Sequence, residues 1–149
     1  MLRQLLVLLH LLGAFAWIGG MFFAHFCLRP AAADVLQPPQ RLPLLTATFA
    51  RFLRYAAIAV VTILATGMIM LAQTGFAQAP IGWHVMLGIG LVMAAVFAYI
   101  YLVLFPKLRA SVAAAAWTQA AQTLNSMRRL VVLNLALGVC TVVAAISAR

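Results

Sequence analysis

The segment Leu5–Leu28, LLVLLHLLGAFAWIGGMFFAHFCL, is an uninterrupted apolar run that contains no acid, no lysine and no arginine. As an α-helix it would be about 36 Å long, which is enough to cross the hydrocarbon core of a bilayer with some tilt. Two of the three histidines of the chain, His10 and His25, lie inside it. Since an ionisable side chain inside a membrane is costly without a partner, both histidines are candidates for a functional site.

The rest of the chain is equally apolar. Of its 149 residues, 67% are hydrophobic and 7% are charged, whereas about a quarter of the residues of soluble domains are charged. One acidic residue stands against ten lysines and arginines, and the basic residues flank apolar segments. This pattern indicates a membrane protein embedded in a lipid bilayer and argues against nucleic acid as a partner.

The apolar segments predict an all-α fold, a polytopic membrane protein with four transmembrane helices in a bundle that forms a single domain over residues 1–149. The four helices are expected at about 5–28, 49–72, 83–105 and 128–147. Repeated prolines predict a cytoplasmic loop over 29–43, because proline does not fit in a helix interior. The alanine-rich segment 111–124 has high helix propensity and is expected to form either a helix at the membrane interface or an extension of a neighbouring helix.

The distribution of basic residues predicts the orientation of the bundle. Eight of the ten flank the connections between the first and second and between the third and fourth helices: Arg29, Arg41, Arg51, Arg54, Lys107, Arg109, Arg128 and Arg129. The opposite side carries Arg3 and Arg149. Because short connections rich in lysine and arginine stay in the cytoplasm, both termini are expected outside, N-out and C-out.

This orientation assigns the histidines to different depths. His10 is expected about two turns inside the outer end of the first helix, and His84 starts the third helix on the same side of the membrane. His25 is expected near the cytoplasmic end, roughly 22 Å from His10 along the helix axis. The outer leaflet is therefore the predicted location of a site, with His10 as the main candidate.

Three methionines are expected at the same outer ends, Met68 and Met70 on the second helix and Met86 on the third. Thioether and imidazole groups suit Cu(I), and imidazole also suits haem iron. The predicted metal ligands are therefore His10, His84, Met86, Met68 and Met70. Each methionine could instead be a packing residue, and His84 could be an anchor at the interface.

Other chemistries find little support in the sequence. The four predicted helices contain no carboxylate, so they offer no cage for Mg²⁺ or Ca²⁺ and no acid–base pair for hydrolysis. No catalytic residue is predicted. Three polar side chains are expected to hydrogen-bond to the backbone or across helices: Thr62, Thr66 and Asn134. Alternatively, Asn134 is expected to hydrogen-bond to a metal ligand and hold it in place.

The first helix contains His10, then Trp17, then Gly19 and Gly20, and this pattern resembles the first helix of the copper-resistance D (CopD) type of membrane proteins. It is also similar to that of the HemJ-type protoporphyrinogen oxidases, which are four-helix proteins of about this size. The pair Trp83-His84 at the start of the third helix resembles both families. The resemblance implies a multi-pass protein of the bacterial inner membrane in which Trp17, Gly19 and Gly20 shape the packing around the site.

The two families imply different functions. CopD-type proteins are associated with copper uptake or homeostasis, which implies copper binding or transport through the predicted site near the outer face. HemJ-type proteins bind haem b, oxidise a porphyrinogen and carry a lysine shortly after the histidine of the third helix. This chain has Met86 at that place, a residue compatible with a copper site. Copper binding is therefore the leading hypothesis for the function.

Two alternatives remain. One is a membrane redox protein with haem b held by His10 and His84, which would be a haem-dependent oxidoreductase if it is an enzyme. The other is a structural subunit of a larger membrane complex. Since four short helices are few for an autonomous pore, a homo-oligomer or a larger complex is also expected.

Overall fold

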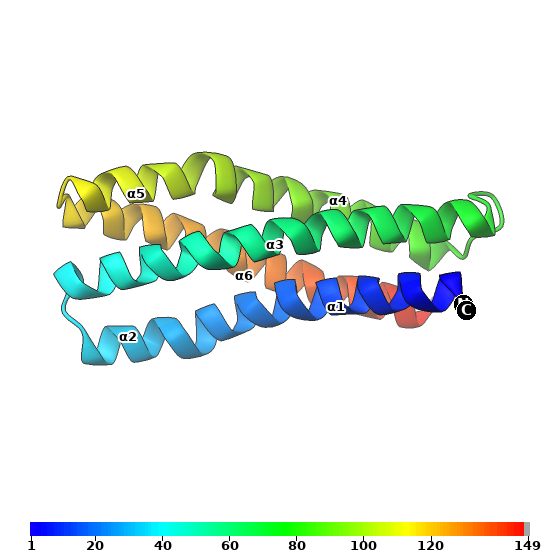
Figure 1. Cartoon of the computed structure of the whole chain (residues 1–149), viewed down its shortest axis with the longest axis horizontal. Coiled ribbons are helices and arrows are strands. Elements are labelled where there is room, and N and C mark those ends of the chain that lie inside the picture. Colours follow the sequence, from blue (N-terminus) through cyan, green and yellow to red (C-terminus); the bar gives the residue numbers. More distant parts are fainter. Residues whose placement is uncertain (148–149) are drawn as a thin grey trace.

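The computed structural model describes residues 1–147, which form four long helical segments that run antiparallel to their neighbours along the chain (Figure 1). The first segment consists of α1 (Leu2–Phe23), the π-helical turn η1 (Ala24–Leu28) and α2 (Arg29–Val35), and the second is α3 (Pro38–Thr74). The third consists of α4 (Ile81–Tyr99), the π-helical turn η2 (Ile100–Leu104) and α5 (Phe105–Ala113), and the fourth is α6 (Trp117–Ser147). All four segments are long and apolar enough to cross a membrane, which confirms the predicted all-α fold with four helices.

The bundle is built from two helix pairs. α1 packs along α3, α4 packs along α6, and the contacts between the pairs are fewer. Both Met1 and the end of α6 lie at the same end of the bundle as the connection 75–80 (Figure 1). The connections between α2 and α3 and between α5 and α6 lie at the other end. Which end faces the cytoplasm stays a prediction.

Most of the predicted loop over 29–43 is helical, and that prediction is wrong for all but residues 36–37. Pro30 lies inside the first segment, which is helical without a break from Leu2 to Val35, and Pro38-Pro39 opens α3. The first N–H groups of a helix have no intrahelical acceptor, so a proline there removes no hydrogen bond. Pro38 and Pro39 therefore start α3, and Pro43 lies inside it one turn further along.

Each of the two π-helical turns comes just before a proline, η1 before Pro30 and η2 before Pro106. In an α-helix, a proline ring collides with the carbonyl four residues earlier. Those carbonyls belong to Phe26 and Leu102, and both residues lie inside the π-helical turns. The wider turn accommodates the ring, so the first and third segments continue beyond the ends expected from the prolines.

The segment 111–124 ends α5 and begins α6, which agrees with the expected helical extension. It does not form a single interfacial helix, because a link of three alanines separates α5 from α6. The link is a Schellman motif, in which the amide of Ala116 donates to the carbonyl of Ser111 (2.9 Å) and the amide of Ala115 donates to that of Val112 (3.1 Å). Ala115 has a φ of 53°, a conformation that usually requires glycine. The antiparallel packing of α5 against α6 thus outweighs the helix propensity of alanine.

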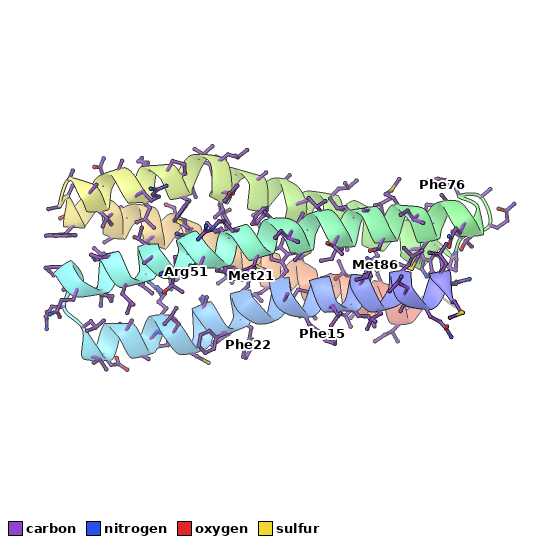
Figure 2. All side chains as sticks on the ribbon, viewed as in Figure 1. Phe15, Met21, Phe22, Arg51, Phe76 and Met86 are labelled. Atoms are coloured by element: carbon purple, nitrogen blue, oxygen red, sulfur yellow. The ribbon has the colours of Figure 1, made fainter. Side chains whose placement is uncertain are left out.

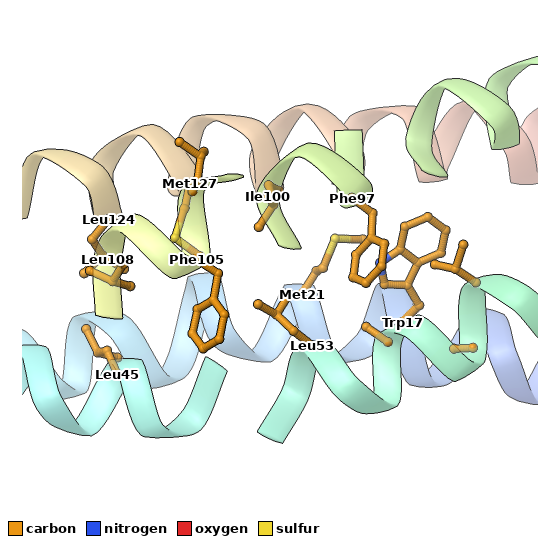
Figure 3. Packing of buried hydrophobic residues seen from close by; sticks show 14 of the residues in the cluster. Trp17, Met21, Leu45, Leu53, Phe97, Ile100, Phe105, Leu108, Leu124 and Met127 are labelled. Carbon is orange, nitrogen blue, oxygen red and sulfur yellow. The ribbon is translucent and has the colours of Figure 1, made fainter. Parts of the chain in front are cut away.

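Buried apolar side chains line the inside of the bundle along its length (Figure 3). Trp17 of α1, which is 4% exposed, packs edge-on against Phe97 of α4 with ring centroids 6.0 Å apart. The outer surface is apolar as well, and Phe15 on the outer face of α1 is 72% exposed (Figure 2). Lipid solvates the inner and the outer face of each helix equally well, so apolar character does not decide which face is buried. Close packing and hydrogen bonds between the helices must decide it.

Two glycines allow α1 to lie close to α3. A Cβ atom added at Gly13 would lie 2.9 Å from Ile63, and one added at Gly20 would overlap the ring of Phe52. Gly19 is exposed, and a Cβ atom there meets nothing within 4 Å among the residues that the structure describes. Of the two adjacent glycines expected to shape the packing, Gly20 alone lies at the helix contact.

Replacing Gly20 by alanine is expected to destabilise the protein by about 1–3 kcal/mol, because Phe52 must leave its place between α1 and α3. Gly19→Ala is the matched control, and because alanine is more favourable than glycine inside a helix, it should leave the stability unchanged or raise it by up to about 1 kcal/mol. Unfolding in detergent, followed by circular dichroism, measures both variants. Equal losses in the two variants would show that α1 does not depend on this close contact.

Candidate functional site

A cavity of about 390 Å³ lies in the half of the bundle that holds Met1 and the connection 75–80. All four helical segments contribute to its wall, which is mostly made of leucine, isoleucine, valine, alanine and glycine. Eight lining residues carry a charge, a ring nitrogen, a hydroxyl or a sulfur: Arg3, His10, Trp17, Met70, Trp83, Met86, Met93 and Thr141. The cavity is therefore an apolar space with few polar groups, as is common for ligand sites.

Two contacts join α1 to α4 at the two ends of this cavity. At the end of the bundle, the guanidinium of Arg3 lies over the ring of Trp83, 5.9 Å from its centroid. Towards the middle of the bundle, Trp17 packs against Phe97. α1 and α4 have few other contacts, so the cavity separates them.

His10 lines the cavity and is held from α3 by a hydrogen bond. Its Nδ1 lies 3.0 Å from Oγ1 of Thr66. That hydroxyl donates its own proton to the backbone, with the carbonyl of Thr62 at 2.6 Å, so it accepts the bond from Nδ1–H. The network thus assigns the proton of the neutral imidazole to Nδ1 and leaves the lone pair on Nε2. An imidazole whose second nitrogen is held in this way is arranged as a metal ligand.

The residue after Thr66 provides space for the ring. A Cβ atom added at Gly67 would lie 3.3 Å from Cε1 of His10, closer than most such contacts allow. The i, i+4, i+8 spacing of Thr62, Thr66 and Met70 already puts these residues on one face of the helix. That spacing marks a face of α3 in the sequence, but it does not show that His10 of α1 meets this face.

The structure brings some of the predicted ligands together and separates others. Met70 of α3 and Met86 of α4 lie on the cavity wall together with His10. His84 and Met68 are not among the lining residues in the part of the chain that the structure describes. Nδ1 of His84 donates to the carbonyl of Pro80 (3.3 Å), and Met68 is 42% exposed on α3. The five predicted ligands therefore stay predictions, with His10, Met70 and Met86 sharing one cavity.

Within residues 1–147, no group of three or more histidines, cysteines or acids comes close enough to hold a metal ion. Figure 2 shows Met86 in the half of the bundle that contains the cavity.

Asn134 lies next to the cavity rather than on its wall. It is 1% exposed, and its Nδ2 donates to the carbonyl of Met93 (3.2 Å), whose side chain lines the cavity. Its buried Oδ1 has no hydrogen-bond partner within residues 1–147. Asn134 thus joins α6 to α4, which agrees with the expected bond across helices.

A comparison with protein families gives a match over residues 46–148, to the model described as CopD, copper resistance protein D. The chain belongs to the CopD family. The family match includes Met70, His84 and Met86, and α1 with His10 lies outside it. Comparisons with curated proteins and with solved structures gave no match. With its four apolar helices, this member of the CopD family is a multi-pass membrane protein of a family named for copper resistance.

Proposed function

We propose that this CopD family protein binds Cu(I) in the cavity between its four helices and helps to move or buffer it near the outer face of the bacterial inner membrane. The observation that carries the proposal is the donor set of the cavity. His10, with its lone pair on Nε2, shares the wall with the thioethers of Met70 and Met86. Imidazole and thioether are soft ligands that suit Cu(I).

The charge of the ion also supports Cu(I). The three donors are neutral, and no acidic residue of the described chain lines the cavity. Arg3 already places one positive charge at the end of the cavity. Cu(I) adds one further positive charge, whereas a divalent ion would add two and cost more to desolvate. The absence of carboxylate ligands also disfavours hard cations such as Mg²⁺ and Ca²⁺ at this place.

His84 and Met68 belong to the proposal as secondary ligands. Both are at the same end of the bundle as the cavity, and His84 stands in the first turn of α4, next to Trp83 on the cavity wall. We propose that they contact copper on its way to or from the cavity. The primary site consists of His10, Met70 and Met86.

The size and the apolar wall of the cavity favour one second candidate, a haem b group bound to His10. A cavity of about 390 Å³ lined by apolar side chains suits a flat hydrophobic cofactor. The imidazole of His10 would supply one axial ligand, and His84 would have to rotate to supply another. This second candidate predicts a coloured protein.

Two measurements on purified protein test the proposal. The optical spectrum should lack a Soret band, and titration with Cu(I) against a competing chelator should give one ion per chain. Met70→Leu and Met86→Leu should each weaken binding roughly tenfold by removing a thioether. Met127→Leu, at a methionine of α6 that is not on the cavity wall, is the matched control. A Soret band that is lost in His10→Ala would replace the copper proposal by the haem proposal, and failure to bind Cu(I) would refute it.

A further inference from the structure

The opposite end of the bundle contains a second, smaller pocket in which basic side chains meet. It has a volume of about 30 Å³, is partly open, and lies between η1, α3 and α6. His25, Arg29 and Arg128 line it together with the rings of Phe49 and Phe52. The copper proposal makes no use of this pocket, which lies at the end that carries the basic connections.

The charges in this basic pocket are not balanced by an acid. The sole acidic residue of the sequence, Asp34, is not among the residues that line it. Arg29 and Arg128 are both half-buried, and the positive charges of Arg128 and Arg41 act on Arg29. Like charges that line one pocket repel each other, so the arrangement costs free energy unless an anion binds between them.

Most of the hydrogen-bonding capacity of the two arginines is available. Nε of Arg128 donates to Oδ1 of Asn125 (3.1 Å), which orients the guanidinium and leaves its four terminal N–H groups for a ligand. Two other arginines at this end behave differently. Arg51 and Arg54 are exposed and donate to carbonyls of their own helix, those of Ala47 and Ala50. The convergence of Arg29 and Arg128 is therefore specific to this pocket.

We propose that the basic pocket binds a phosphate group, supplied either by the headgroup of an anionic phospholipid or by free phosphate. Two guanidinium groups offer planar, paired N–H donors that match phosphate oxygens. About 30 Å³ is the space of one water molecule in the liquid, so one or two phosphate oxygens enter and the remainder stays at the open side. The phenyl rings beside the guanidiniums favour a lipid source, since basic pockets between transmembrane helices are known to hold lipid headgroups.

Binding would also join the helices at this end. Arg29 is the first residue of α2, and Arg128 belongs to α6. A phosphate between them replaces repulsion by two charge-assisted interactions, so the first and fourth helical segments would be held together by the ligand. The proposal thus predicts a bundle that is more stable with the ligand than without it.

The test uses the full chain in detergent, with dioleoyl phosphatidylglycerol, dioleoyl phosphatidylcholine and inorganic phosphate added separately. Thermal unfolding and native mass spectrometry measure binding. Phosphatidylglycerol should raise the unfolding temperature and stay bound, and phosphatidylcholine with the same tails should do neither. Arg29→Gln and Arg128→Gln should each weaken the apparent affinity about tenfold or more, since each removes charge-assisted hydrogen bonds. Arg128→Lys keeps the charge and loses the planar donor pair, so its apparent affinity should lie between that of these variants and that of the wild type.

Arg51→Gln is the matched control, an exposed arginine outside the pocket, and should bind phosphatidylglycerol as the wild type does. Stabilisation by inorganic phosphate equal to that by phosphatidylglycerol, and lost in the Arg29 and Arg128 variants, would support the phosphate site and identify a free anion as its source. The proposal is overturned if neither ligand binds, or if Arg51→Gln weakens binding as much as Arg29→Gln.

Discussion

Replacing His10 by alanine is expected to lower the affinity of the protein for Cu(I) by more than about 100-fold, because it removes the one imidazole on the cavity wall. Titration against a competing Cu(I) chelator measures this loss. His25→Ala is the matched control, a histidine of the same helical segment that lines the basic pocket at the other end. Its affinity should equal that of the wild type, and binding in His10→Ala at the wild-type level would refute the site.

Thr66→Val separates the role of the ring from the role of its orientation. Valine has nearly the shape of threonine but cannot accept a hydrogen bond from Nδ1–H. In Thr66→Val, neither the tautomer nor the orientation of the His10 ring is therefore fixed by this contact. The expected loss in Cu(I) affinity is about 10–100-fold, as for other partners of metal-binding histidines. An affinity unchanged in Thr66→Val and lost in His10→Ala would show that the imidazole binds without this support.

Trp17→Ala is expected to destabilise the bundle by about 3 kcal/mol, at the lower end of the range for large aromatic residues in cores. The side chain is buried, packs on Phe97 and closes the inner end of the cavity, so its removal enlarges an existing space. The loss is smaller than in a soluble core because lipid solvates the exposed apolar groups in the separated state.

Phe15→Ala provides the control for this prediction. Phe15 lies two residues earlier on the same helix and points outward, so its removal should change the stability by less than about 0.5 kcal/mol. Denaturant or thermal unfolding in detergent gives both values. Equal losses for Trp17→Ala and Phe15→Ala would mean that the tryptophan is not held in a packed core.

The number of helices could be predicted because it depends on apolar length alone. Each span needs about 20 apolar residues, and the chain contains four such runs. The helix ends could not, because the effect of a proline depends on its position. Pro38 opens a helix and Pro30 follows a π-helical turn inside one, whereas a general rule against proline in helices predicts a loop. The alanines that end α5 are strong helix formers, and only the packing of α6 onto α5 explains the turn there.

The candidate site could also be predicted only in part. A lone histidine in an apolar helix needs a partner, and the structure supplies one for His10. The identity of that partner depends on how α1 is rotated against α3, which no single segment reveals. Likewise, Trp83 faces the cavity and the next residue, His84, does not, because one step along a helix turns the side chain by about 100°.

The π-helical turn η1 changes the direction of the side chains that follow it relative to those that precede it in the first segment. A π-helical turn contains one residue more than an α-helical turn, and each residue turns the following side chains by about 100°. Before η1, the helix directs His10 towards the cavity, and from η1 onward it directs His25 and Arg29 towards the basic pocket. The one extra residue in η1 thus sets the face of the helix on which His25 and Arg29 meet the basic pocket.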